Sequence, residues 1–266
     1  MASRAMKTTH VPMSMYDVTV QTVHHLTPRM LRVTFAASTL RDFADDGPDQ
    51  RLKLLLPRQG QDRPLIPSGP DGWYKVWRRM PDHQRPVLRT YTVRNARPAD
   101  GELDVDIVLH GDSGPGTHWA EQARPGDRVA IHAAYADYEP DGSVRQLICG
   151  DLTALPAISA IVERLDQSCA ATVVIEVPSD DERIDLRAGP KVDVAWVHAH
   201  SGHPGAALVD SVARLEDAAI GDYAWVAGER RTATGIRRHL VRERNLRPEQ
   251  VMFMGYWRTD GPIDDD

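Results

Sequence analysis

Short runs of alternating or β-branched apolar residues fill the first half of the chain. Clusters of Pro, Gly and Asp separate these runs, which is the pattern of antiparallel strands joined by tight turns. The runs are Tyr16–Leu26, Leu31–Ala37, Arg51–Leu56, Val87–Arg94, Leu103–His110 and Arg128–Ala133. Six strands of this kind predict a small antiparallel Greek-key β-barrel.

Near residues 140–145, at Glu-Pro-Asp-Gly-Ser, the pattern changes to strands and helices in turn. Apolar residues recur at helical spacing between residues 155 and 165, and Asp151 or Thr153 can cap that helix. The expected strands are Gln146–Cys149, Thr172–Val177, Val192–His198, Tyr223–Val226 and Val251–Tyr256, and the expected helices are Leu155–Leu165, Leu208–Glu216 and Gly235–Arg244. This alternation predicts a parallel sheet covered by helices. The fold class is therefore β + α/β, with domains at 15–140 and 145–259.

One strand combines a cation with a flat ring. Side chains alternate along a strand, so Arg89 and Tyr91 project together, whereas Thr90, Thr92 and Arg94 project to the other side. The cation can clamp a pyrophosphate, the phenol ring can cover an isoalloxazine, and the Thr92 hydroxyl or the backbone can reach flavin N5. An ordinary amphipathic strand has the same pattern.

A glycine-rich turn follows about twenty residues later. It starts at His110 and continues through Gly114, Pro115 and Gly116 to Thr117, where a short helix pattern begins. The free N–H groups at such a helix start form an anion site, although many Gly-Pro-Gly turns are only turns. A strand with a cation followed by a Gly-rich helix start supplies two phosphate contacts in order. Together they predict a flavin site.

Composition and charge limit the function classes. The chain has 266 residues, which suits two domains of about 120 to 130 residues each. The net charge of −6 argues against a general nucleic-acid surface. No run approaches the roughly 20 apolar residues of a membrane span, and the amino terminus lacks the apolar stretch of a secretion signal. We therefore expect a cytoplasmic monomer that binds neither nucleic acid nor membrane.

The two cysteines indicate neither a disulfide nor a zinc site. Cys149 and Cys169 lack the spacing of either, and Cys149 fits a buried structural thiol.

These motifs together resemble a known family. The sequence is similar to the siderophore-interacting proteins, the flavin-dependent ferric-siderophore reductases related to the ferredoxin-reductase superfamily, over roughly residues 16–259. The ordered motifs are Arg89-x-Tyr91-Thr92-x-Arg94, Val108-Leu-His-Gly111 with Gly114-Pro115, Gly150-Asp-Leu-Thr-Ala-Leu-Pro-Ala157, Ala227-Gly-Glu229 and Gly255-Tyr-Trp-Arg258. Five motifs in the same order make the resemblance specific.

The resemblance implies FAD as cofactor, NADPH or NADH as electron donor and a ferric siderophore as substrate. A flavin accepts the two electrons of a hydride and passes them on singly, as Fe(III) requires. Reduction releases iron because the hard oxygen donors of siderophores hold Fe(III) better than Fe(II). The alternatives are a flavin-dependent oxidoreductase acting on an organic substrate and a non-catalytic ferric-chelate-binding protein.

Further site residues are implied by the resemblance. Asp151, Thr153 and Ala154 are expected near the flavin and the nicotinamide, although Thr153 also fits a plain helix cap. Glu229 can hydrogen-bond a ribose or orient the nicotinamide, or it is a solvated carboxylate at a helix start. Lys53 and Arg258 are expected at the anionic substrate, but most such cations are simply solvated.

The chain departs from the family pattern in places. The segment 133–138, Ala-Ala-Tyr-Ala-Asp-Tyr, replaces a common Gly-Pro-Arg-Gly and favours a less anionic chelate such as a hydroxamate. Thr117 replaces a common serine and keeps the hydroxyl. Segment 196–200 has histidines where an arginine is frequent, so cofactor preference does not transfer, and Arg230 and Arg231 favour NADPH. Residues 58–86 form a long Pro-, Gly- and Arg-rich insertion, which is a functional or mobile loop.

Overall fold

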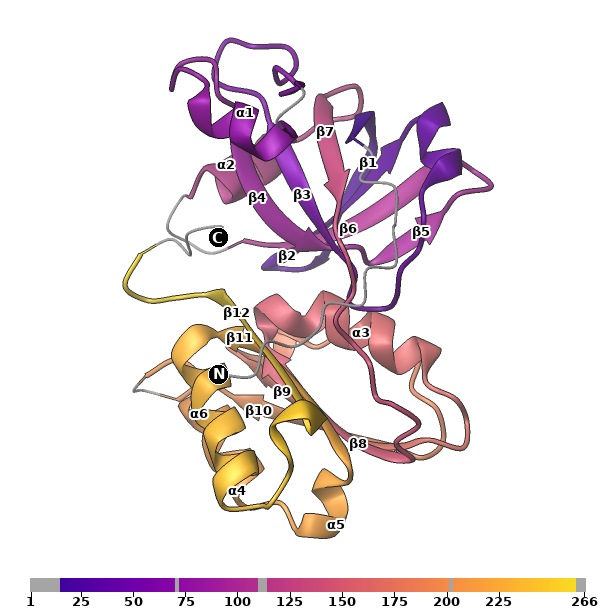
Figure 1. Ribbon diagram of the computed structural model, residues 1–266, viewed down its shortest axis with the longest axis vertical. Helices are drawn as coiled ribbons and strands as arrows, with labels where there is room; N and C mark the ends of the chain where they lie inside the picture. Colours follow the sequence, from indigo (N-terminus) through magenta and orange to yellow (C-terminus); the bar gives the residue numbers. More distant parts are fainter. Residues whose placement is uncertain (1–14, 70–71, 110–113, 201–202, 262–266) are drawn as a thin grey trace.

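The computed structural model describes residues 15–69, 72–109, 114–200 and 203–261, which form two sheets (Figure 1). The first sheet is antiparallel, in the order β4-β3-β7-β1-β2-β6-β5. Its strands are β1 (Met15–Thr27), β2 (Met30–Ala36), β3 (Arg51–Leu56), β4 (Val87–Thr92), β5 (Asn95–Arg97), β6 (Glu102–Val108) and β7 (Arg128–Ala133). The predicted antiparallel sheet is confirmed.

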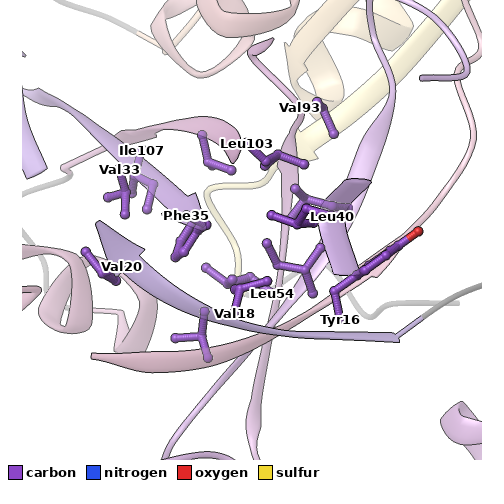
Figure 2. Packing of buried hydrophobic residues seen from close by; sticks show 14 of the residues in the cluster. Tyr16, Val18, Val20, Val33, Phe35, Leu40, Leu54, Val93, Leu103 and Ile107 are labelled. Carbon is purple, nitrogen blue, oxygen red and sulfur yellow. The ribbon is translucent and has the colours of Figure 1, made fainter. Parts of the chain in front are cut away.

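Alternation of the side chains gives this sheet one continuous apolar face. Val18, Phe35 and Leu54 come from three strands and meet in the same buried cluster, as Figure 2 shows. The edge strands β4 and β5 are separated along the chain only by residues 93 and 94. The chain therefore passes directly from one edge strand of the sheet to the other at this point, which directly follows the predicted flavin residues of β4 in sequence.

The second sheet is parallel, in the order β10-β9-β8-β11-β12. Its strands are β8 (Arg145–Asp151), β9 (Ala170–Val177), β10 (Val192–His198), β11 (Tyr223–Glu229) and β12 (Val251–Trp257). This confirms the predicted parallel sheet. From β8 the chain adds β9 and β10 on one side of the sheet, and it then returns to add β11 and β12 on the other side. The order therefore reverses between β8 and β11. Ligands bind parallel sheets at such a switch point, at the carboxyl ends of the strands.

Helices cover both faces of the parallel sheet. They are α3 (Leu155–Arg164), α4 (Ala206–Ala213), α5 (Asp217–Ile220) and α6 (Arg230–Arg242). Helix α3 packs on one face with the fully buried Trp225, and α4 and α6 pack on the other with Cys149. Burial raises the pKa of the Cys149 thiol to about 12, in keeping with a structural role. Short 3-10 turns lie at Ser38–Asp42, Leu152–Ala154, Asp180–Glu182 and Pro248–Gln250.

Buried contacts join the two sheets. Met30 is a β2 residue, yet its fully buried side chain belongs to the core under α3. The Trp225 indole donates a hydrogen bond to Asp49 Oδ2 (2.9 Å), and Asp49 Oδ1 accepts the backbone N–H groups of Asp137 and Tyr138. Burial raises the pKa of the Asp49 carboxyl despite these hydrogen bonds. The contacts fix how the two sheets lie against one another.

Two further helices lie on the antiparallel sheet: α1 (Trp73–Arg79) and α2 (Pro115–Gln122). Helix α1, which the sequence pattern missed, lies in the insertion and packs its aromatic residues on the small cluster of Leu55, Leu88 and Ala130. Among the described residues, no helix combines the length and apolar character that a membrane crossing requires.

Helix α1 also covers His132 of β7. The Trp73 and His132 rings lie 4.5 Å apart, the histidine is 4% exposed, and neither ring nitrogen has a hydrogen-bond partner in the described part of the chain. Burial, assisted by the charge of Lys53, lowers the pKa of His132 from 6.5 to about 4. The folded protein therefore holds this histidine neutral where the unfolded chain protonates it.

His132 should make the protein less stable in mild acid. Between pH 6.5 and pH 4 the unfolded state binds the extra proton, so the free energy of unfolding falls as the pH decreases through this window and levels off below it. Urea unfolding at a series of pH values should show this slope, and His132→Leu should reduce it. His25→Leu, at an exposed position of β1, is the control. An unchanged slope in His132→Leu would contradict the prediction.

Candidate functional site

The start of α2 packs directly on β4. Gly114 is the N-cap, and Pro115 follows at a position where its missing N–H costs nothing. A Cβ atom on Gly116 would lie 2.6 Å from the Tyr91 hydroxyl oxygen and 3.2 Å from Arg89 Cγ. Only glycine permits this approach. The structure thus brings together the two motifs that the sequence predicted to act together.

Arg89 and Tyr91 share one side of β4, as the alternation predicted. Arg89 Nη1 donates a hydrogen bond to the Leu88 carbonyl (2.7 Å), and within the described residues the guanidinium pairs with no carboxylate. Burial raises the pKa of Tyr91 to about 12, against the opposing effect of the Arg89 charge, so the phenol stays neutral. A cation without a carboxylate partner beside a helix start suits a phosphate group.

The other β4 residues contact different parts of the molecule. Thr92 is 5% exposed and its side chain lies near the Tyr256 phenol of β12, so it lies where the two sheets meet. Arg94 donates two hydrogen bonds to Glu163 of α3 (2.9 and 2.5 Å) and lies 3.7 Å from Asp106. The Arg94 guanidinium is thus held by carboxylates at the junction between the sheets. Thr117 is buried in α2, and His110 lies outside the described residues.

The Asp151 carboxylate collects hydrogen bonds at the switch point. Oδ1 accepts the Thr153 N–H (2.9 Å) and the Thr153 hydroxyl (2.5 Å). Oδ2 accepts the backbone N–H of Glu229 (2.8 Å) and the indole N–H of Trp257 (2.8 Å). One carboxylate therefore joins the carboxyl ends of β8, β11 and β12. Ala154 is fully buried beside it, and a Cβ on Gly150 would lie 2.5 Å from the Ala154 methyl carbon.

Glu229 is different because one of its oxygens has no partner. The side chain is 3% exposed, and Oε2 accepts the Thr232 N–H (2.8 Å) as the cap of α6. Oε1 is buried without a hydrogen-bond partner in the described part of the chain. Burial of an unpaired carboxylate oxygen is costly. A ligand hydroxyl or amide N–H at this position would satisfy the atom.

The two cations predicted to bind the substrate lie on different elements: Lys53 is on β3 of the antiparallel sheet, and Arg258 directly follows β12. Lys53 Nζ donates a hydrogen bond to Thr90 (2.8 Å), and Lys53 is the cross-strand neighbour of His132. Arg258 follows β12 and hydrogen-bonds the Gly261 carbonyl (3.2 Å). No hydrogen bond or ion pair described here joins Lys53 to Arg258.

Segment 133–138, which departs from the family pattern, contributes an ion pair that the sequence did not predict. Asp137 pairs with Arg51 (2.5 Å), and Arg51 Nη1 also contacts Met254 Sδ of β12 (3.0 Å). Arg51 is the cross-strand neighbour of Thr92. The sequence placed Arg51 and Lys53 on one face of a strand, but it had no signal for the pairing with Asp137.

The antiparallel sheet carries a helix start that suits a phosphate group, and the parallel sheet carries a buried acceptor at its switch point. This combination is that of a two-part flavoprotein of the reductase type. The chain belongs to the siderophore-interacting protein family. The model of the siderophore-interacting FAD-binding domain matches residues 19–137, and that of the siderophore-interacting protein matches residues 144–260. FAD is thus the cofactor expected of the first region.

Individual proteins agree with this assignment. Ferric vibriobactin reductase ViuB of Vibrio cholerae is 28% identical over 240 residues, which cover 88% of this chain and 86% of that protein. The crystal structure of a siderophore utilization protein from T. fusca superposes with a TM-score of 0.82 at 28% identity, covering 94% of this chain and 95% of that one. A ferredoxin reductase of carbazole 1,9a-dioxygenase, 15% identical, has a TM-score of 0.62 and covers 92% of this chain and 70% of its own. This last likeness concerns the fold alone.

Gly116→Ala should weaken FAD binding without unfolding the protein. The new methyl group displaces the Tyr91 phenol, which is the movable end of a side chain, whereas alanine itself favours the helix. We expect FAD affinity, measured by quenching of flavin fluorescence, to fall by about tenfold or more, equivalent to about 1.4 kcal/mol. Gly114→Ala is the matched control, since no atom of the described residues lies within 4 Å of its added Cβ. Equal affinities for the two variants would contradict the assignment.

Asp151→Asn should destabilise the parallel sheet. An amide cannot accept from all four donors, and hydrogen bonds to a charged group contribute about 1.5–3 kcal/mol each. We expect a loss of at least about 2 kcal/mol in the free energy of unfolding, measured with urea. Asp166→Asn is the control. Asp166 is exposed and accepts the N–H and the hydroxyl of Ser168, two residues further on, in the same way as Asp151 accepts those of Thr153. Similar losses in both variants would show that the turn, rather than the junction of three strands, is what matters.

Proposed function

We propose that this chain is an FAD-dependent NAD(P)H:ferric-siderophore reductase that releases iron by reducing Fe(III) to Fe(II). The main support is the close approach of Gly116 to Arg89 and Tyr91, which sets a helix start beside a flat neutral ring and a cation that pairs with no carboxylate among the described residues. The relative named ferric vibriobactin reductase supports the reaction. We further propose domains at 15–140 and 145–259, a monomer and a cytoplasmic location.

The described residues fit FAD. In our proposal Arg89 and the N–H groups at Gly116 and Thr117 bind the pyrophosphate, and Tyr91 covers the isoalloxazine. Gly114 and Pro115 set the direction of the helix start. Thr92, which lies near Tyr256 at the junction of the sheets, would offer its hydroxyl to the bound flavin. We assign Arg94 to holding α3 against this strand, because Glu163 already occupies its guanidinium.

The electron donor binds, in our proposal, at the switch point of the parallel sheet. Glu229 Oε1 accepts a hydrogen bond from the nicotinamide amide or a ribose hydroxyl, which would supply the partner that the described residues lack. Asp151, which also binds Thr153, holds Glu229 in place, and the fully buried Ala154 packs against Gly150 behind this turn. Arg231 is paired with Asp260 (3.1 Å). We therefore retain both NADPH and NADH as donors.

Bound FAD would convert a two-electron hydride donor into a source of single electrons for Fe(III). The protein contributes alignment, because the buried contacts between the sheets hold Tyr91 and Thr92 in a fixed position relative to Glu229. Lys53 and Arg258 attract the chelate. The pairing of Asp137 with Arg51 removes one positive charge from the same region, which supports a weakly charged chelate such as a hydroxamate.

An anaerobic spectroscopic titration tests the proposal. The purified protein loaded with FAD should bleach on addition of NADPH or NADH, and its flavin band should return when a ferric trihydroxamate is added, while a ferrous trap develops colour. Glu229→Gln should retain FAD but require more nucleotide for the same bleaching rate, because it loses the accepting carboxylate. The double variant Arg89→Ala/Tyr91→Ala should retain no FAD.

The other outcomes separate the alternatives. Bleaching without electron transfer to iron would favour an oxidoreductase acting on an organic acceptor. A wild-type protein that takes up no FAD would leave only a chelate-binding role. Full FAD retention by the double variant would contradict the proposed flavin site while leaving the reaction itself open to the same assay.

A further inference from the structure

The described parts of the insertion, residues 58–69 and 72–86, are held to the fold by side-chain contacts, and no step of the proposed reaction uses them. Arg58 Nε donates a hydrogen bond to the Arg85 carbonyl (2.7 Å) and so ties the two ends of the insertion together. The Trp77 indole donates to the Pro86 carbonyl (2.9 Å), and the Arg85 guanidinium lies over the Trp77 ring at 5.2 Å. The outward surface of the insertion is therefore presented in a defined position.

Two adjacent aliphatic side chains project from the insertion into solvent. Leu65 is 45% exposed and Ile66 is 39% exposed, whereas Pro64 and Pro67 on either side are buried. The prolines restrict the backbone on both sides of the pair. The other large apolar side chains that are exposed in the described part of the chain are isolated in sequence, namely Tyr135, Val144, Val209 and Phe253. We call Leu65 and Ile66 the aliphatic tip.

The insertion that carries the aliphatic tip is positively charged. Residues 58–86 contain six Lys and Arg but only three Asp, a net charge of +3 in a chain whose net charge is −6. On α1 the exposed Lys75 and Arg78 are three residues apart and so share a side of the helix, while Trp73 and Trp77 pack toward the sheet. Arg63, exposed, directly precedes Pro64.

We propose that this surface binds an anionic lipid bilayer. The aliphatic tip enters the headgroup region, and Arg63, Lys75 and Arg78 lie against the lipid phosphates. A bilayer fits better than a protein partner, because protein interfaces are enriched in exposed aromatic residues. Here the aromatic residues of α1 are packed beneath the helix. The absence of a spanning segment led us to expect no membrane contact; peripheral binding needs no such segment.

The location of the insertion is compatible with this role. Figure 1 shows α1 and the chain before it at the end of the molecule farthest from the parallel sheet. A bilayer at that end leaves the carboxyl edge of the parallel sheet open to a soluble nucleotide. The proposal does not depend on the reductase activity, because it rests on surface residues outside the candidate flavin site.

Cosedimentation of the full chain with vesicles tests the proposal. The protein should bind vesicles of phosphatidylglycerol and phosphatidylcholine at low salt, should bind pure phosphatidylcholine at least about tenfold more weakly, and should be released by 0.5 M salt, at which the charges are screened over about 4 Å. Lys75→Glu/Arg78→Glu should lower the partition coefficient by about tenfold or more, and Leu65→Ser/Ile66→Ser should lower it as well.

Matched variants elsewhere on the surface control for folding and net charge. Arg214→Glu/Arg247→Glu changes the net charge by the same amount, and Val144→Ser/Val209→Ser removes two exposed aliphatic side chains from the parallel-sheet half. Retained binding by both controls, with loss in both insertion variants, supports the proposal. Wild-type protein that binds no anionic vesicle, or insertion variants that bind as the controls do, would overturn it. Circular dichroism of each variant confirms that it is folded.

Discussion

The arrangement of the parallel sheet depends on the Asp151 carboxylate. Its four donors come from the turn after β8, the end of β11 and the end of β12, which are three segments far apart in the chain. The fit is close, because Gly228 has a φ of +139° and a Cβ there would lie 2.5 Å from Asp151 Oδ2. A glycine is needed so that this carboxylate can reach the Glu229 N–H. The direction in which α6 starts, and with it the position of Glu229, follows from this contact.

A second constraint fixes the parallel sheet against the antiparallel one. Asp49 accepts hydrogen bonds from Trp225 and from the backbone of the segment that links the sheets, and Thr27 donates to the buried Glu182 (2.5 Å). Hydride transfer from a nucleotide to a flavin is sensitive to a misplacement of the reacting atoms by about 1 Å. Polar contacts that are directional, and whose loss leaves a buried charge, maintain such alignment better than an apolar interface that can slide.

The sequence predicted the parts of the fold that local patterns determine. Alternating runs located most strands of both sheets to within a few residues, and Arg51–Leu56, Arg128–Ala133 and Val192–His198 match the structure completely. The three-residue β5 was missed because it is too short to show alternation. Helix α1 was missed because its aromatic residues pack on a cluster formed by distant strands, which no local pattern reveals.

The same division holds for the candidate site. Alternation and the Gly-rich turn predicted that Arg89 and Tyr91 share a side and that a helix start follows, and the structure adds that Gly116 touches both. Sequence reasoning left Thr153 open between a cap and a site residue, and its hydroxyl bonds Asp151. The pairing of Arg94 with Glu163 and of Arg51 with Asp137 was beyond reach, since each pair joins residues more than 60 positions apart.

Hydrogen-bond satisfaction distinguishes the buried carboxylates that build the scaffold from the one that suits a ligand. Asp151 and Asp49 accept hydrogen bonds on both oxygens, and so does Glu176, which receives the N–H groups of Gly205 and Leu208 (both 2.9 Å). Among buried side-chain atoms that lack a partner in the described residues, Glu229 Oε1 is the only carboxylate oxygen. Three contacts hold Glu229 in place: Gly228 allows the close approach of Asp151, Asp151 accepts the Glu229 N–H, and Glu229 itself caps α6. The missing partner of Oε1 therefore does not reflect loose packing. Within the described residues the other buried carboxylates are satisfied and one acceptor at the switch point is not, which is why we propose that a bound molecule completes it there.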